Sequence, residues 1–170
     1  MLSAASPSAL VTPDSCASID GLSALLPAGA SSARMASRLA TCGRDAVVQV
    51  PAARWDVHAQ PALPEPIASR VRHTGFVTGA DLADNAAVAV SPAEAAAMDP
   101  QQRLLLERGY LALHGARYTK YSLASTLTGV FVGIGATEWV DILRTLPAGS
   151  GMFSQTGFTF SIASGRLSFT

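Results

Sequence analysis

The side chains best suited to nucleophilic chemistry in this chain are its two cysteines, Cys16 and Cys42. Cys16 lies in a D-S-C-A-S run, but a reactive thiolate needs a cationic neighbour, a paired histidine or a helix N-terminus. No amphipathic helical pattern follows Cys16, and the nearest histidine along the sequence is His58. Cys42 closes a helical pattern, where a free cysteine usually acts as a small apolar residue. We therefore assign a catalytic role to neither thiol.

The three histidines, His58, His73 and His114, show no catalytic or metal-binding pattern. His58 and His73 lie in proline-rich, loop-like surroundings, and His114 closes a helical pattern that begins at Asp99. A histidine near a helix C-terminus is more often a favourable partner of the helix dipole than a catalyst. None of the histidines or cysteines has the H-x-x-x-H or C-x-x-C spacing of a metal site. The sequence therefore predicts no metal site.

Two serines, Ser161 and Ser164, invite comparison with hydrolases. Neither lies in a G-x-S-x-G elbow or near an evident base, so we interpret both as small packing residues. The glycines around Ile134 do not form a dinucleotide-binding fingerprint, and the chain has no phosphate-binding G-x-x-x-x-G-K run. We therefore predict no cofactor-binding residue and no catalytic residue in this chain.

The composition bounds the size and the partners of the protein. Its 170 residues are enough for one domain, and 49% of them are hydrophobic. Only 14% are charged, against about 25% in ordinary globular proteins, which suits a piece of a larger and more buried fold. The formal net charge is zero, so no electrostatic surface for nucleic acid or an anionic membrane is predicted. No apolar run is long enough to span a bilayer.

The cysteine content and the N-terminal segment bear on location. Two cysteines without a framework spacing indicate a reducing compartment. The first positive charge is Arg34, so a secretory signal is a poor interpretation, and Asp14 and Asp20 argue against a transit peptide. We expect a cytoplasmic protein, with a plastid as the weaker alternative. Residues 1–17 are small, polar and aperiodic and are expected to be poorly ordered, which leaves 18–170 as the folded part.

The strongest local pattern in the chain is two helix starts in succession. Ser91 caps a short helix, with proline at the first helical position and glutamate three residues after the cap. Asp99 then caps a second helix, also with proline first, and Gln102 is expected to close a capping box. Gly115 supplies a stop. The pattern predicts a bend in the chain where the second proline interrupts the first helix.

The second helix is predicted to be amphipathic and structural. Leu106, Tyr110 and Leu113 share one face, which we expect to be packed. Arg103 and Glu107 lie four residues apart and are expected to form a surface ion pair that contributes some tenths of a kcal/mol.

Other elements follow from periodicity. We predict a helix over 32–42, a short strand over 46–50, a strand over 130–134, a helix over 138–146 and a last helix from about Thr159. The 130–134 run is continuously apolar, as in a strand covered on both faces of a parallel sheet. This order favours α/β layering.

The region between the first strand and the capped helices is predicted to be irregular. Residues 57–73 hold three prolines and are interpreted as a connection without regular structure. Trp55 is expected to be buried as the anchor of a loop, with Arg54 and Asp56 beside it as a potential ion pair. An ordinary loop aromatic fits the same residues equally well.

Several of these motifs together resemble a known family. The run M-D-P-Q-Q-R-L-L-L-E over 98–107, T-G-V-F-V-G over 128–133, and T-G followed by S-I-A-S-G-R-L-S-F within 156–169 are similar to segments of polyketide-synthase ketosynthases. The G-R-D-A-V and V-P-A-A-R-W-D elements within 43–56 resemble that family too. The order and approximate spacing agree from 19 to 170.

The resemblance implies a fold and a chemistry. Ketosynthases have the thiolase-like fold, an α/β architecture of layered helices and sheets that is built from two related halves and acts as a homodimer. They catalyse a decarboxylative Claisen condensation, in which an acyl chain held as a cysteine thioester is extended by malonyl units on acyl carrier protein. No metal or redox cofactor is required. This chain would form an incomplete N-terminal portion of that fold, with residues 19–27 as its first strand and turn.

The resemblance also shows where this chain departs from the family. Ala83, Val88 and Ala89 stand where bulkier residues or glycine are usual. Large-to-small changes in a core cost about 2–5 kcal/mol when the site cannot collapse. The sequence therefore leaves two possibilities open, a repacked region or a degenerate copy.

The catalytic residues of the family are not found in this chain. The nucleophilic cysteine of ketosynthases lies in a T-A-C-S-S run after the G-R-L-S-Y segment, and two histidines follow much later, whereas this sequence ends at Thr170. One interpretation is a beta-ketoacyl synthase fragment of polyketide or fatty acid biosynthesis that is inactive alone. The alternative is a non-catalytic, ketosynthase-like protein or scaffold. Continuation of the transcript into T-A-C-S-S favours the first, and a stop codon favours the second. An unrelated binding domain requires the matches to be coincidental.

Overall fold

The computed structural model describes residues 17–56, 63–124, 126–135 and 138–169. Helices dominate, and a two-stranded antiparallel sheet is the regular β structure of these residues. The elements in chain order are η1 (Pro27–Gly29), α1 (Ala33–Thr41), β1 (Val48–Gln49), α2 (Glu65–Val71), β2 (His73–Thr74), α3 (Pro92–Ala97), α4 (Pro100–Gly115), α5 (Lys120–Leu123), α6 (Trp139–Arg144), η3 (Pro147–Ser150), α7 (Ser154–Phe158) and α8 (Phe160–Phe169).

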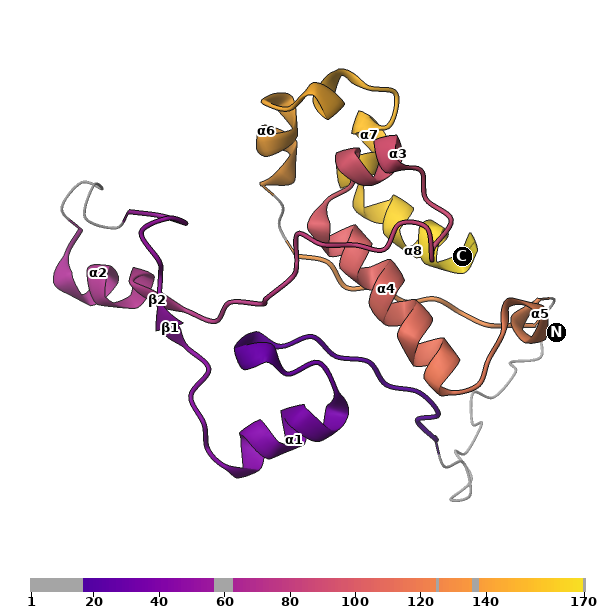
Figure 1. The fold of residues 1–170 in the computed structure, drawn as a ribbon, viewed down its shortest axis with the longest axis horizontal. Helices are drawn as coiled ribbons and strands as arrows, with labels where there is room; N and C mark the ends of the chain where they lie inside the picture. Colours follow the sequence, from indigo (N-terminus) through magenta and orange to yellow (C-terminus); the bar gives the residue numbers. More distant parts are fainter. Residues whose placement is uncertain (1–16, 57–62, 125, 136–137, 170) are drawn as a thin grey trace, which may run out of the picture.

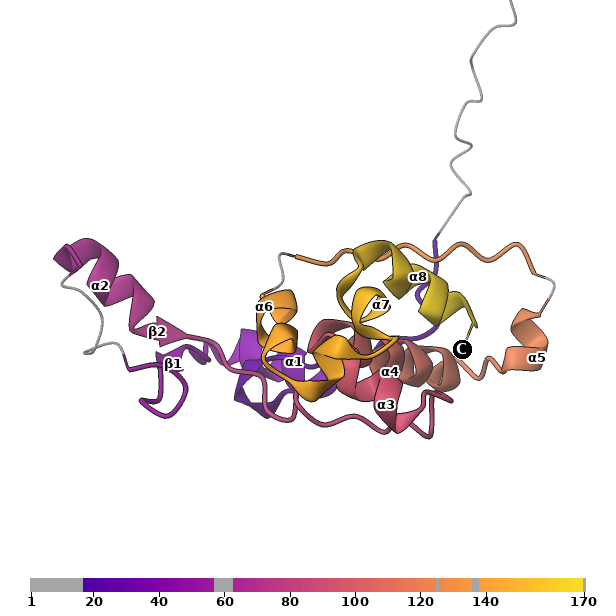
Figure 2. The ribbon, with the colours of Figure 1, turned by 90° about the horizontal axis from the view of Figure 1, so that it is seen from above.

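The helices of the second half form the packed part of the molecule. Figures 1 and 2 show α7 and α8 lying over α3 and α4, with α6 at one end of this group. The largest fully buried apolar side chains, Met98, Leu106 and Leu143, belong to this cluster. The small sheet and α2 project away from it. The core therefore lies where the α3–α4 bend meets α6, α7 and α8.

The predicted helix starts are confirmed. Ser91 accepts a hydrogen bond from the Glu94 amide at 3.2 Å and caps α3, and Asp99 accepts one from the Gln101 amide at 2.8 Å and caps α4. The helix predicted over 32–42 is α1, which Ser32 caps through the Met35 amide. These caps need only partners within three residues, so the local sequence is sufficient to specify them.

Two details of the long helix differ from expectation. Gln102 does not close a capping box, because its side chain is buried and bonds elsewhere. The helix does end at Gly115, as predicted, but the glycine does not adopt the left-handed conformation itself. Ala116 is the C-cap, and the left-handed residue is Arg117 after it, with φ of 64°, which is uncommon for a non-glycine residue.

The predicted face of α4 is only partly packed. Leu106 is 2% exposed, whereas Tyr110 is 45% exposed. The predicted Arg103–Glu107 surface pair was wrong, because Glu107 forms an ion pair with its neighbour Arg108. Arg103 instead turns toward α6, where its guanidinium lies 5.9 Å from the centre of the Trp139 ring.

One of the predicted strands is present in the structure, and two are not. The strand predicted over 46–50 is confirmed as β1, which pairs with β2 in the register Val48 to Thr74. Residues 19–25 and 127–135 carry no strand, and Phe131 is 96% exposed. A strand is defined by backbone hydrogen bonds to a neighbour, and no described residue supplies one to either segment. The layered α/β architecture is thus seen only in part.

The connection predicted over 57–73 is also more regular than expected. It contains α2, which begins after Pro64 and has a second proline in its first turn, a position that tolerates proline. Trp55 is 37% exposed and is not a buried anchor. Its neighbour Arg54 lies 5.8 Å from the centre of the Phe76 ring, so a cation–π contact joins the loop to the chain after β2.

The two helices predicted in the C-terminal part of the chain are both present. The helix predicted over 138–146 is present but shorter, as α6, and the helix predicted from about Thr159 is α8. Beside Gly165 in α8, no described atom lies within 4 Å of the position that an added Cβ would occupy. The tight contact between α4 and α8 is at Gly109, where an added Cβ would lie 2.5 Å from Leu167 Cδ1.

Candidate functional site

The best-defined polar arrangement in the structure surrounds Gln102 on α4. This side chain is 2% exposed, and its Nε2 donates to the carbonyl oxygens of Thr156 at 3.3 Å and Thr159 at 3.2 Å. Those carbonyls belong to α7 and to its C-cap, directly before α8. A single buried amide on α4 therefore holds the C-terminal part of α7.

An ion pair between charged side chains also joins α3 to α8. Glu94 on α3 forms an ion pair with Arg166 on α8, and both side chains are largely buried. Arg166 also donates to Thr156 Oγ1 at 3.3 Å. Breaking a buried pair by removing one partner costs about 3–5 kcal/mol, because the other charge is then left uncompensated. The ion pair thus makes the position of α8 depend on α3.

The backbone at the α3–α4 bend contacts α6 and α7 directly. The Asp99 amide donates to the Gly157 carbonyl at 2.8 Å, and Trp139 Nε1 donates to the Ala97 carbonyl at 2.9 Å. Gly157 is required here, because an added Cβ would lie 2.0 Å from Ala97 O. The bend, produced by the proline after Asp99, is therefore the point against which the later helices are placed.

Arg103 links this site to the preceding loop. Its Nη1 lies 3.5 Å from the Asp81 carbonyl oxygen, and its guanidinium lies against Trp139. Burial lowers the pKa of Arg103 from its ordinary value, and the nearby Asp99 and Asp81 carboxylates oppose that effect. Arginine stays charged at neutral pH despite such a shift, so Arg103 contributes a fixed positive charge.

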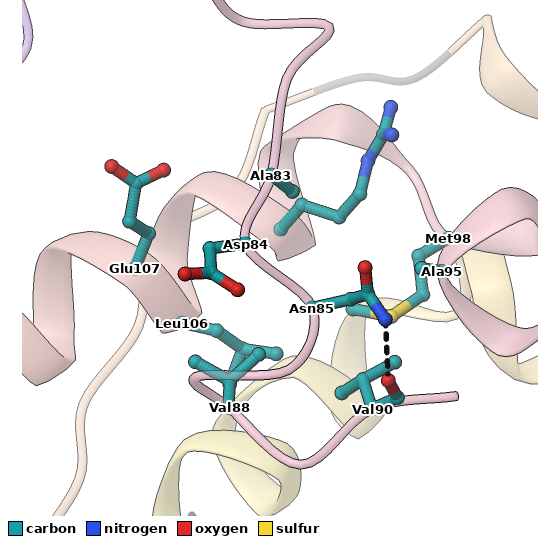
Figure 3. Close-up of a pocket in the computed structure, with 10 residues that line it drawn as sticks. Ala83, Asp84, Asn85, Val88, Val90, Ala95, Met98, Leu106 and Glu107 are labelled. Carbon is teal, nitrogen blue, oxygen red and sulfur yellow. Dashed lines mark hydrogen bonds between the residues drawn. The ribbon is translucent and has the colours of Figure 1, made fainter. Parts of the chain in front are cut away.

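The loop before α3 closes over this helix and leaves almost no space. Figure 3 shows a cavity whose walls include Ala83, Val88 and Leu106, with the Asn85 side chain bonded to the Val90 carbonyl at 2.9 Å. Its volume is about 10 Å³, close to the minimum for one water molecule. Ala83 and Val88 thus line a small hollow between this loop and α4, and Ala89 after them has a left-handed backbone, with φ of 53°.

The candidate nucleophiles and bases that the structure describes, Cys42, His73 and His114, lie on three different elements. Cys16 and His58 lie outside the described residues. Cys42 ends α1 and is exposed, so it does not pack as the expected apolar residue. His73 lies in β2, and its Nδ1 is 3.2 Å from the Ser69 carbonyl oxygen. His114 lies in the last turn of α4, where its ring stacks on that of Tyr110 with 5.9 Å between the ring centroids.

The two serines considered above belong to α8. The Ser164 hydroxyl donates to the Ser161 carbonyl at 3.4 Å, which is a helix-internal contact rather than one to a base. The described ranges contain no group of three or more His, Cys, Asp or Glu side chains that could hold a metal ion. Among the same residues, no helix has the length and apolar character needed to cross a membrane. The contacts around Gln102 and Glu94 thus fix helices relative to one another.

Solved structures share this arrangement of elements. The ketosynthase from module 6 of the bacillaene synthase of Bacillus subtilis 168 superposes with a TM-score of 0.67 at 25% identity, over 88% of this chain and 23% of that one. The oxazolomycin ketosynthase domain OzmH KS7 of Streptomyces albus JA3453 superposes with a TM-score of 0.69 at 24% identity, over 89% of this chain and 27% of that one. The structure thus resembles part of a ketosynthase domain.

Residues 17–170 match the family described as beta-ketoacyl synthase, N-terminal domain, and the chain belongs to that family. It is 40% identical over 135 residues to the spectinabilin polyketide synthase system protein NorC of Streptomyces orinoci, covering 78% of this chain and 6% of NorC. It is 38% identical over 160 residues to polyketide synthase GfsB of Streptomyces halstedii, covering 92% of this chain and 3% of GfsB. The chain spans only a small fraction of these relatives.

Proposed function

We propose that this chain is the N-terminal part of a ketosynthase that elongates acyl chains in polyketide or fatty acid biosynthesis. The observation that carries the proposal is the family match over 17–170, which includes the bend and helices described above. The polyketide-synthase relatives and the superposed ketosynthases support the same class of reaction.

The proposed reaction joins two thioesters. Loss of carbon dioxide from a malonyl thioester on acyl carrier protein leaves a carbanion at the adjacent carbon. That carbanion attacks the carbonyl of an acyl chain held on a cysteine, a carbon–carbon bond forms, and the cysteine leaves as the thiolate. In the family this cysteine belongs to a T-A-C-S-S run, and two histidines assist. The described residues contribute none of these groups.

The contribution of this chain in such an enzyme is structural. Gln102, Asp99 and the Glu94–Arg166 pair hold α7 and α8 against the α3–α4 bend. Catalysis by positioned groups is sensitive to small displacements, because reacting atoms must be held in a near-attack geometry. We propose that these contacts provide the rigid support on which that geometry depends. Acyl carrier protein and a second ketosynthase subunit are the proposed partners of the complete domain.

A chimera tests this function. The segment of the bacillaene module-6 ketosynthase that superposes on this chain would be replaced by residues 17–170, leaving the host's own downstream residues in place. The purified chimera would be incubated with an acyl thioester and its intact mass recorded. We expect one acyl group on a host cysteine.

The control is the same exchange made with the superposing segment of the oxazolomycin ketosynthase. A folded chimera that is not acylated, alongside an acylated control, would favour the alternative of a non-catalytic scaffold. A chimera that does not fold, alongside a folded control, would contradict the proposed structural role of this chain as well.

A further inference from the structure

A second hollow lies far from the bend, at the C-terminal end of α1. Its volume is about 200 Å³, and its walls include Arg38, Leu39, Cys42 and Arg44 together with residues of η1. The helix contributes one arginine and the turn after it contributes the other. The walls of this pocket therefore include two exposed arginines, a cysteine and apolar residues.

The local backbone explains why the two arginines meet. Gly43 adopts φ of 59°, a left-handed conformation that glycine reaches without strain. The Arg44 amide then donates to the Leu39 carbonyl at 3.2 Å, so the chain folds back along the helix that it has just left. This turn places Arg44 on the same hollow as Arg38, six positions earlier along the chain.

Arg38 and Arg44 are the charged residues of this pocket's walls. No acidic residue belongs to its walls, and within the described part of the chain neither Arg38 nor Arg44 has a hydrogen-bonding or ion-pair partner for its guanidinium. By contrast, Arg72 lies 3.7 Å from Glu65 and Arg144 lies 3.0 Å from Asp141. The helix C-terminus adds a partial negative charge of about half a unit, which two full positive charges exceed.

From this combination we propose that the pocket binds a small anion with a carboxylate or phosphate head. Guanidinium groups recognise both heads through paired hydrogen bonds, because their donors form a planar fork. Leu39 and Met35 supply an apolar wall for whatever the head carries. This site is independent of the ketosynthase reaction and uses none of the residues at the α3–α4 bend.

The thiol of Cys42 is a built-in reporter of this site. In a Cys16→Ser chain, alkylation of Cys42 by iodoacetate and by iodoacetamide would be followed by intact mass. The rate with iodoacetate divided by the rate with iodoacetamide reports the electrostatic potential at the thiol, since only iodoacetate is an anion. We expect Arg38→Gln and Arg44→Gln each to lower this ratio about two- to threefold, as the removal of one nearby unit charge does in water. Arg34→Gln, an exposed change on α1 outside the pocket, is the matched control and should leave the ratio unchanged.

Competition identifies the head group and the contribution of the apolar wall. Inorganic phosphate, acetate and hexanoate would be added at constant ionic strength, so that general screening is held fixed. Slower alkylation with phosphate assigns a phosphate site, and slower alkylation with hexanoate than with acetate assigns a carboxylate with an apolar tail. The proposal is overturned if no anion protects Cys42, or if Arg34→Gln lowers the rate ratio as much as the two pocket variants. Circular dichroism of each variant shows that the fold is retained.

Discussion

The close approach of α7 to the α3–α4 bend predicts a severe effect for the substitution Gly157→Ala. The new Cβ would lie 2.0 Å from Ala97 O and 2.8 Å from Ala97 C, so backbone rather than a flexible side chain must move. Overpacking of this kind costs about 1–3 kcal/mol. The shift would also break the 2.8 Å hydrogen bond from the Asp99 amide to the Gly157 carbonyl, which costs about 1–3 kcal/mol for a buried donor.

One effect opposes these losses. Alanine favours a helix over glycine by about 1 kcal/mol, and residue 157 lies within α7. The expected result is therefore a loss of about 3 kcal/mol in the free energy of unfolding. With a slope of about 2 kcal/mol per molar urea, the unfolding midpoint should fall by about 1.5 M.

Trp139 provides the assay, because its Nε1 donates to the Ala97 carbonyl at the same contact. Urea unfolding would be followed by its fluorescence in a Trp55→Phe background. Gly165→Ala is the matched control, since no atom lies within 4 Å of its added Cβ, and it should be stabilising by about 0.5–1 kcal/mol. Equal midpoints for Gly157→Ala and Gly165→Ala would refute the close contact on which the expected loss depends.

Three further predictions concern the buried amide, the exposed apolar segment and the thiol. Gln102→Glu should be destabilising above the carboxyl's unfolded pKa of about 4.3. Burial beside two carbonyl oxygens raises its folded pKa, so stability falls as pH rises between the two values, as pH-dependent unfolding relative to the parent chain would show. Phe131→Lys should reduce self-association in light scattering, since an exposed apolar segment with unpaired backbone groups is a template for pairing with another copy. Incubation with acyl carrier thioesters should leave Cys42 unmodified in intact-mass spectra, because no described base is bonded to it.

Each of these three predictions has an outcome that would contradict it. For Gln102→Glu, a stability that does not fall relative to the parent above pH of about 4.3 would mean that the amide does not face two carbonyls. Tyr121→Lys is the control for Phe131→Lys, because residue 121 is 92% exposed but lies on α5. If both variants reduced the scattering equally, the effect would reflect the added charge alone. An acyl adduct on Cys42 would show that this residue had been wrongly excluded as a nucleophile.

Sequence reasoning succeeded best where the determining contacts are short-range. The caps Ser91 and Asp99 and the bend between their helices are as predicted. It failed for Trp55, whose burial depends on what else packs over the loop, and for α2, where prolines suggested an irregular connection. Prolines at the start of a helix and prolines in a loop give similar composition, so the pattern alone did not distinguish them.

The candidate site was only partly predictable for the same reason. Gln102 was interpreted as a capping residue because its partner was sought three residues away, whereas its actual partners, Thr156 and Thr159, lie 54 and 57 positions further along. The pairing of Glu94 with Arg166 spans 72 positions and leaves no mark in either local sequence. The two-arginine pocket was also not anticipated, although the glycine between Cys42 and Arg44 was a usable signal of a chain reversal.

The sequence by itself determined the family of this protein and the places where its main helices begin, because motifs and caps depend on residues that are neighbours along the chain. Only the tertiary structure decided which face of α4 is buried, where Gln102 and Arg166 find partners, and that residues 127–135 lie unpaired among those described. Those outcomes depend on which distant segments come together to exclude water and to satisfy buried polar groups, and a linear pattern does not contain that information.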